Sequence, residues 1–402
     1  MNINVVKLTS IVIALLPWLG NYKFIVNGLT LGDFLLLLVF ILNIVSTKRI
    51  NLVNLRTPQK HLINFYIYAV IIVLLSLFFG NIFSYELVSN RTLKMGFYFI
   101  IMFFLIPGCT NFKYFLKAYK SIVYLSCFAI TVQYIGNYVL GMYFEFKIPF
   151  LNYSSESAEQ FDYSLSRLTS FRPDSLFLEP SHFVYYIIGY IIICLFWEKQ
   201  KNPKIFEAAI ITLFALMSVS STGIFFLAVV WVYFVILLVI KKELSLQKKL
   251  MLVLIVSVLS VSVIYVFFST DISNSLLRLS IDESSNSSSG AWNKITLGNE
   301  YFIKLDLIQK IFGIGLGNYP IGTFTTSNYF ILYCTGIIGM GIIILWSVQN
   351  YLKGNHLGKV MILVTLMLFT SWYVIYSSFF VLFNMLIIND RYDKKNIQIR
   401  YE

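Results

Sequence analysis

The chain contains the stretch Arg172-Pro173-Asp174-Ser175-Leu176-Phe177-Leu178-Glu179-Pro180-Ser181-His182-Phe183, which carries an arginine, two acidic residues and a histidine. An apolar run from Phe183 to Trp197 follows at once, and its composition is typical of a membrane-embedded helix. Ionisable residues at the entrance of a membrane helix are costly and usually functional. The stretch therefore indicates both a membrane fold and the place to look for a site.

The composition of the whole chain favours the same fold class. Of its 402 residues, 58% are hydrophobic and 12% are charged, whereas a soluble domain has about 25% charged residues. We therefore expect an all-α, polytopic integral membrane protein. The net charge of +12 does not indicate nucleic-acid binding, because no soluble domain is large enough to carry a basic surface. In a membrane protein, an excess of basic residues indicates which loops lie in the cytoplasm.

Apolar segments long enough to cross a bilayer recur along the chain. A spanning helix needs about 20 mostly apolar residues. We predict about 12 spans in a single polytopic domain over residues 1–402, at roughly 5–20, 28–46, 62–80, 93–108, 119–141, 178–197, 205–220, 222–240, 249–268, 326–347, 357–371 and 373–389. The turn-like sequence from Ser218 to Gly223 separates the seventh span from the eighth. One long helix from Leu213 to Ile240 is the alternative.

The basic residues orient these spans. With the N-terminus in the cytoplasm, about two thirds of the 31 Lys and Arg residues fall in inner segments, and most acidic residues fall on the outer side. This distribution is the one that membrane proteins favour. Removing one central span would place the basic loop around Lys241 to Lys249 outside, which argues for an even number. Both termini are therefore predicted to be cytoplasmic.

Two predicted outer segments are long, at about 142–177 and 269–325. The second contains the flexible tract Ser284-Ser285-Asn286-Ser287-Ser288-Ser289-Gly290. Long loops without secondary structure are uncommon and often functional. We expect a site on this outer face, since both segments also hold spaced arginines and acids. Two disordered surface loops are the alternative.

The first outer segment ends where a helix is predicted to begin. Proline is favoured in the first helical turn, so the span should start at Pro180. A helix start together with the guanidinium of Arg172 suits a phosphate or diphosphate. Glu179 and His182 are three residues apart and share a helix face. Alternatively, Glu179 caps the helix and His182 is an interfacial polar residue.

Further candidates lie in the same two segments. Arg167, Arg278 and Lys294 supply positive charge for a phosphate or an acidic sugar, and a solvated face is the alternative. The sequence Gly313-Ile314-Gly315-Leu316-Gly317-Asn318-Tyr319-Pro320 is a weak nucleotide fingerprint, because no strand precedes it. It favours a tight backbone turn, with Asn318 a candidate substrate-binding residue.

Small residues inside the spans suggest packing roles. Gly336, Gly339 and Gly341 are expected to permit close approach of neighbouring helices. The hydroxyls of Ser218, Ser220 and Ser221 are expected to bond between helices or to pack there. The four cysteines show neither a disulfide framework nor metal-ligand spacing, so no metal and no cofactor is expected.

These motifs together resemble a known family. An arginine, then Phe-Leu-Glu-Pro-Ser-His-Phe opening a span, then Ser-x-Ser-Ser-Thr-Gly, and a long outer loop ending in Gly-Ile-Gly-Leu-Gly-Asn are similar to the O-antigen and capsular polysaccharide repeat-unit polymerases (Wzy type). This family belongs with the O-antigen ligases. The motifs cover about 165–345, and the predicted topology covers the whole chain.

The resemblance implies a glycosyltransferase of the bacterial cytoplasmic membrane. Such a polymerase moves a growing glycan from undecaprenyl diphosphate to the next lipid-linked repeat unit at the outer face. A chain-length regulator and a flippase are possible partners, beside membrane lipid. Family members often have further arginines in the second large loop, where this chain offers Arg278 and the deeper Lys294.

The chemistry of the candidate residues fits that role. Positive charge from Arg172, with Arg278, would hold the diphosphate leaving group. Glu179 or His182 would deprotonate the acceptor hydroxyl. An O-antigen ligase is the alternative within the family. A lipid-linked oligosaccharide flippase is the alternative from another class, although a transporter should place charges in mid-membrane and show repeated halves.

Overall fold

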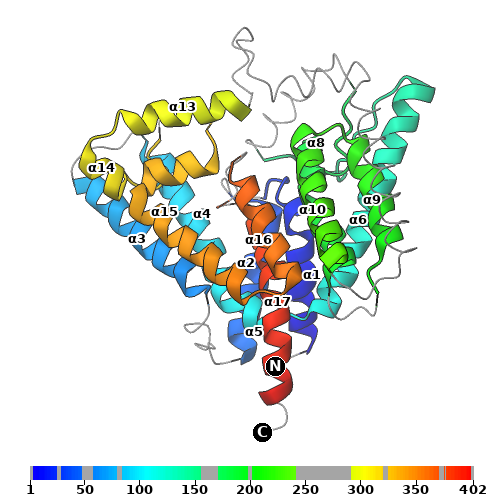
Figure 1. Cartoon of the computed structure of the whole chain (residues 1–402), viewed down its shortest axis with the longest axis horizontal. Helices are drawn as coiled ribbons and strands as arrows, with labels where there is room; N and C mark the ends of the chain where they lie inside the picture. Colours follow the sequence, from blue (N-terminus) through cyan, green and yellow to red (C-terminus); the bar gives the residue numbers. More distant parts are fainter. Residues whose placement is uncertain are drawn as a thin grey trace. The chain divides into compact units, whose positions relative to one another are not determined.

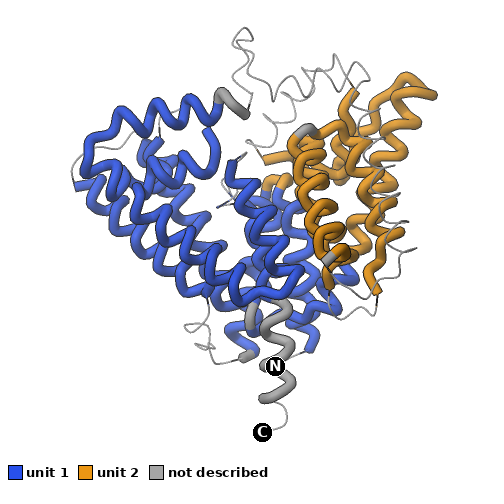
Figure 2. The backbone as a smooth tube through the Cα atoms, viewed as in Figure 1, with its two compact units in different colours: residues 1–20, 24–119, 286–402 blue, residues 21–23, 120–285 orange. Residues whose placement is uncertain are grey.

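The computed structural model describes residues 3–24, 29–47, 58–78, 84–154, 171–197, 202–240, 291–319, 325–370, 375 and 377–399. Over these residues the chain is mostly helical and contains no β-strand, beyond an isolated bridge between Tyr22 and Tyr153. Two compact units divide it, as Figure 2 shows. Unit 1 comprises residues 1–20, 24–119 and 286–402, and unit 2 comprises residues 21–23 and 120–285.

Unit 1 is built from helices at both ends of the sequence (Figure 1). These are α1 (Ile3–Leu19), α2 (Leu31–Thr47), α3 (Lys60–Phe78), α4 (Tyr85–Ile100), the π-helical η2 (Ile101–Leu105), α5 (Ile106–Cys109), α13 (Ala291–Ile303), α14 (Leu307–Phe312), α15 (Ser327–Lys353), α16 (His356–Leu368) and α17 (Ser378–Ile399). Helix α15 packs against α3, and α1 packs against α2 and α17. Segments more than 200 residues apart in sequence are therefore neighbours.

Unit 2 holds the stretch that leads into the apolar run. Its helices are most of α6 (Phe112–Ile135), the π-helical η3 (Gly136–Leu140), α8 (Pro180–Phe196), α9 (Ile205–Met217) and α10 (Ser221–Ile240). Helix α8 packs against α9 and α10, and nearly all its side chains are buried. A helix that is apolar all round is expected at such a central position.

Local sequence explains where several helices begin. Pro180 occupies the first turn of α8, as predicted. Asn355 caps α16 by accepting a hydrogen bond from the Gly358 N–H at 2.9 Å. Asp306 and Gln309 form a reciprocal capping box at α14. These side chains satisfy the N–H groups that a helix start leaves without partners.

Each predicted span that the structure describes overlaps a helix, although α9 and α16 have only 13 residues each. Within the described part of the chain, four helical segments are long and apolar enough to cross a membrane, namely Lys60–Phe78, Phe112–Leu140, Thr222–Val239 and Ser327–Lys353. Shorter apolar helices accompany them. A helical membrane protein is therefore supported. The predicted span at 249–268 lies outside the described residues, and the number of spans stays a prediction.

The predicted division between the seventh and eighth spans is confirmed, because α9 ends at Met217 and α10 begins at Ser221. The Ser218 hydroxyl donates to the Ala215 carbonyl at 2.7 Å. The Ser220 hydroxyl accepts from the Gly223 N–H at 3.2 Å. The hydroxyls of Ser218 and Ser220 thus bond nearby backbone groups at a helix end. Both residues are buried, which agrees with the predicted packing role and not with bonds between helices.

The predicted turn at 313–318 is confirmed, and it lies against an interruption of α15. Gly336 has φ 66° and ψ −171°, so α15 is two helices joined there. The N–H groups of Ile314 and Gly315 donate to the carbonyls of Tyr333 and Cys334 at 3.3 and 2.9 Å. The turn thus satisfies carbonyls that the broken helix leaves free, as a membrane environment requires.

The packing role predicted for the α15 glycines is supported at Gly336, where a Cβ would clash with the Ile311 carbonyl of α14 and would lie 2.6 Å from the Gly313 nitrogen. The positive φ of Gly336 also favours glycine at the chain break. A Cβ at Gly339 would clash with the Thr335 side chain of the same helix, whereas its distance of 3.4 Å from the Phe65 ring of α3 is an ordinary contact. A Cβ at Gly341 would meet nothing within 4 Å, so the packing expectation is wrong there.

Candidate functional site

The segment from Phe171 to Glu179 lies at the start of α8 in unit 2. Its middle, from Pro173 to Leu178, is buried, whereas Arg172 and Glu179 at its two ends are half-buried. The segment therefore has a fixed centre and two accessible charged side chains.

Glu179 occupies the N-cap position of α8, but its side chain makes no capping hydrogen bond. Its Oε2 accepts a hydrogen bond from the Ser181 hydroxyl at 3.0 Å. A carboxylate used to cap the helix would accept from backbone N–H groups of the first turn. The alternative reading of Glu179 as a cap is therefore not supported, and the carboxylate is available to act as a base.

His182 is placed differently. It is 5% exposed and lies beside Tyr185, with ring centroids 6.2 Å apart. It follows Glu179 by three residues and interacts with it electrostatically. A general base must reach the proton that it removes, so of the two predicted candidates Glu179 is the better placed.

The centre of the segment is held by a polar network that the sequence reading did not single out. The Gln133 side chain of α6 donates from Nε2 to Asp174 Oδ1 at 2.8 Å and to the Phe144 carbonyl at 3.1 Å. The Tyr143 hydroxyl donates to the same Asp174 Oδ1 at 2.7 Å. Gln133 and Asp174 are 0% and 6% exposed. One buried amide thus joins α6 to the centre of the segment.

Ser175 adds a second attachment to α6. Its N–H donates to Gln133 Oε1 at 2.9 Å, and its hydroxyl donates to the Ser126 carbonyl at 2.6 Å. Ser175 has φ 62°, a left-handed conformation that is uncommon for residues other than glycine. Such strain persists where the surroundings hold the residue firmly. Both backbone and side chains of Asp174 and Ser175 therefore fix the segment.

Burial changes the ionisation of this network. Loss of hydration raises the pKa of the Asp174 carboxyl from 3.8 to about 7, and the hydrogen bonds from Tyr143 and Gln133 oppose that rise. Burial beside Asp174 also raises the pKa of the Tyr143 hydroxyl, which stays protonated as a donor. Asp174 therefore changes charge near neutral pH.

Aromatic rings flank the start of the segment. Phe171 makes edge contacts with Tyr134 and Tyr138, at centroid distances of 5.2 and 5.6 Å. The Tyr134 hydroxyl donates to the Met217 carbonyl at 2.6 Å, so it also satisfies the last turn of α9. These contacts hold Phe171, the residue before Arg172, against the end of α6 and against η3.

The remaining predicted residues lie elsewhere. Arg167 and Arg278 are outside the described residues. Lys294 is half-buried on α13 of unit 1. Asn318 is 1% exposed, and its side-chain amide donates to the Ile314 carbonyl at 2.9 Å. Asn318 thus stabilises the glycine turn of unit 1. Over the described residues, no group of three or more His, Cys, Asp and Glu side chains could hold a metal ion.

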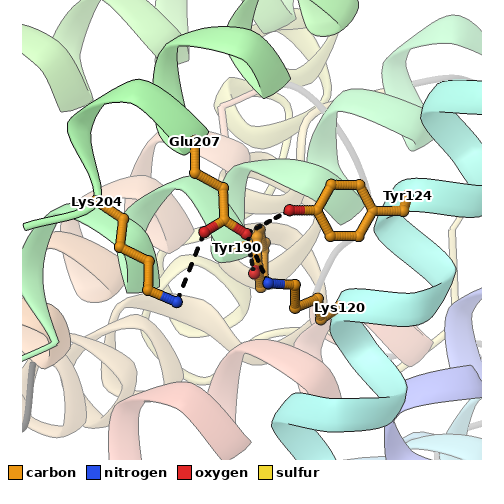
Figure 3. A network of polar contacts seen from close by, with 5 residues as sticks. All are labelled: Lys120, Tyr124, Tyr190, Lys204 and Glu207. Atoms are coloured by element: carbon orange, nitrogen blue, oxygen red, sulfur yellow. Dashed lines mark hydrogen bonds and ion pairs between the residues drawn. The ribbon is translucent and has the colours of Figure 1, made fainter.

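A second polar network in unit 2 centres on Glu207 (Figure 3). Its Oε1 accepts from the Tyr190 hydroxyl of α8 at 2.7 Å and pairs with Lys120 of α6 at 3.0 Å. Tyr124 donates to the same oxygen, and Lys204 pairs with Oε2 at 3.6 Å. Lys120 and Gln133 lie towards opposite ends of α6, so the two networks hold different ends of unit 2.

No protein-family model and no curated protein matches this chain.

The sequence did carry a signal for the missed hub residue. Gln133 is a polar residue inside the predicted span 119–141, and such residues are rare and usually bonded within the protein. Nothing in the sequence, however, indicated that its partner would be Asp174, 41 residues away.

Proposed function

We propose that this protein is an oligosaccharide repeat-unit polymerase. It transfers a growing glycan from undecaprenyl diphosphate to the next lipid-linked repeat unit, in O-antigen or capsule biosynthesis. In this proposal the protein crosses the inner membrane of a bacterium about 12 times, with both termini in the cytoplasm. The segment from Phe171 to Glu179, here called the Arg172 segment, lies at the outer face of that membrane. The distribution of basic residues along the sequence supports this topology.

One observation supports the proposal most. The centre of the Arg172 segment is buried and bonded to α6, whereas a cation and a carboxylate at its two ends are left half-buried. A guanidinium binds a diphosphate through paired hydrogen bonds. The Glu179 carboxylate, which does not cap its helix, can accept a proton.

In the proposed reaction, the acceptor hydroxyl oxygen forms a bond to C1 of the donor sugar. The bond between C1 and the diphosphate oxygen breaks, and its electron pair leaves with the diphosphate. Arg172 stabilises the negative charge that develops there. Glu179 takes the proton of the acceptor hydroxyl. Arg278, which lies outside the described residues, is proposed as a second cation for the diphosphate.

The test is a glycan ladder on a gel. The gene is deleted in its host and complemented, at matched protein levels, with wild type, Arg172→Ala or Glu179→Gln. Two matched controls are Lys147→Ala, an exposed cation of the same outer segment, and Glu300→Gln, an exposed carboxylate of α13. The proposal expects a ladder with wild type and both controls, and a single capped repeat unit with the other two.

Other patterns would identify other functions. A deletion strain that keeps long glycan on its lipid carrier would indicate an O-antigen ligase. A strain in which no repeat unit reaches the outer face would indicate a flippase. A full ladder with Arg172→Ala would remove the central role given to this residue.

A further inference from the structure

Asp174 lies between the two side chains to which the reaction is assigned. It follows Arg172 by two residues and precedes Glu179 by five. The centre of this segment is attached to α6 through Gln133, which bonds both the Asp174 carboxylate and the Ser175 N–H. The positions of Arg172 and Glu179 therefore depend on contacts that neither residue makes itself.

We propose that Gln133 and Asp174 are positioning residues that hold Arg172 and Glu179 in the geometry for glycan transfer. This inference rests on the proposed function. Neither residue needs to touch substrate, because their effect passes through the backbone of the segment. Ser175 in its left-handed conformation is the point where that backbone is constrained.

The contacts are arranged as a positioning role requires. Hydrogen bonds join the segment to α6 and to the loop after η3. Gln133 donates to Asp174 and to the Ser175 carbonyl, and Tyr143 of that loop donates to Asp174. The Ser175 N–H donates to Gln133, and the Ser175 hydroxyl donates to the Ser126 carbonyl. Buried, mutually bonded groups of this kind are rigid. Misplacing a reacting group by about 1 Å can lower a rate by about 100-fold.

The contacts of Gln133 could position the reacting residues or could only stabilise the fold, and the test separates these two roles. Gln133→Leu removes the hub amide and keeps the side-chain size. Tyr143→Phe removes one hydroxyl and keeps the ring, and provides a milder variant if Gln133→Leu does not fold. Asp174→Asn keeps an Oδ1 that can accept from Gln133 and Tyr143. Thr212→Val is the control, because it removes the buried acceptor of Trp231 between α9 and α10.

Two readouts are measured on purified full-length protein in lipid nanodiscs. The first is hydrogen–deuterium exchange of the backbone amides of residues 174–179. The second is the initial rate of polymer formation, as kcat and KM, with the lipid-linked repeat unit extracted from the deletion strain. We expect Gln133→Leu to speed exchange and to lower kcat by about 10- to 100-fold. Tyr143→Phe should have a smaller effect on both readouts. Asp174→Asn should retain most of the wild-type rate, and Thr212→Val should change neither readout.

The outcomes separate this inference from the function on which it rests. Unchanged exchange in Gln133→Leu, or a kcat within about twofold of wild type while Arg172→Ala is inactive, overturns the positioning role and leaves the polymerase proposal intact. Loss of rate in Thr212→Val to the same extent also overturns it, because a general folding defect would then explain the effect. A wild-type protein that forms no polymer overturns both proposals, whatever the exchange shows.

Discussion

The Tyr190 hydroxyl of α8 donates a hydrogen bond of 2.7 Å to the carboxylate of Glu207 on α9. The same carboxylate bonds Tyr124 and Lys120 of α6 (Figure 3). One acidic side chain thus joins three helices of unit 2 at the end away from Gln133. Because membrane helices gain little from apolar burial against lipid, such polar contacts contribute to their association.

Replacing Glu207 with alanine should therefore destabilise unit 2. The change removes the acceptor of two tyrosines and the partner of two lysines, and we expect a loss of about 2 to 4 kcal/mol. Thermal unfolding in detergent measures it. Glu300→Ala, at an exposed position of α13, should stay within about 0.5 kcal/mol of wild type. Equal unfolding temperatures for the two variants would show that the network does not hold the helices.

The interruption of α15 gives a second prediction. Gly336→Ala introduces a Cβ at a positive φ and 2.6 Å from the Gly313 nitrogen. We expect a loss of at least about 2 kcal/mol, since both strain and the displaced turn contribute. Gly341→Ala is the matched control, because its Cβ meets nothing within 4 Å and alanine favours a helix by about 1 kcal/mol. An unfolding temperature for Gly336→Ala at or above that of Gly341→Ala would contradict a required break.

Apolar length and composition predicted the long apolar helices, because a span needs a long apolar run whatever its neighbours are. They did not predict α13 and α14, which lie within the predicted outer segment 269–325. They were not sufficient for Gly336. The glycines at 336, 339 and 341 look alike in the sequence, yet the first breaks the helix against α14, the second lies against the Thr335 side chain, and the third meets open space. These roles depend on which segments pack beside α15, and that is a tertiary property.

The candidate site shows the same division. The helix start at Pro180 followed from the residues of the first turn. That Glu179 would accept from Ser181 and not from the helix backbone depends on a side-chain conformation. The attachment of Asp174 to Gln133 joins residues 41 positions apart, so neither spacing nor periodicity could have indicated it.

The buried Asp174 predicts a pH dependence of stability. Burial raises its pKa from 3.8 to about 7 in the folded protein. Between these values the folded state holds a proton that the unfolded state has lost, so stability falls as pH rises and the loss is complete above about pH 7. The groups that influence Asp174 include the Tyr143 hydroxyl and the Glu145 carboxylate. The loss in free energy of unfolding between low and neutral pH is at most about 4 kcal/mol.

Asp174→Asn has no ionisable group at this position, so it should lack that loss. Its unfolding temperature relative to wild type should increase between pH 5 and pH 8, measured in the same detergent. A difference that does not change with pH would mean that Asp174 keeps the same charge over this range.

Metal independence stays a prediction that activity can test. The diphosphate is an adequate leaving group when cations stabilise its charge, and Arg172 is assigned to that task. Polymer formation in nanodiscs should therefore continue at the wild-type rate after prolonged treatment with a chelator. Loss of activity that returns on adding a divalent cation would show that a metal ion supplies part of the positive charge.

The geometry of a guanidinium gives the sharpest test of the proposed role of Arg172. Arginine presents a planar fork that binds two phosphate oxygens at once, whereas lysine offers a compact point charge. If charge alone were needed, Arg172→Lys would keep most of the activity of wild type. We expect instead a fall in kcat/KM of about 10-fold or more, with a further fall in Arg172→Ala.

Lys147→Ala, which removes an exposed cation of the same outer segment, should leave kcat/KM unchanged. Equal rates for Arg172→Lys and wild type would assign Arg172 to general electrostatic attraction and would leave paired recognition of the diphosphate to another residue.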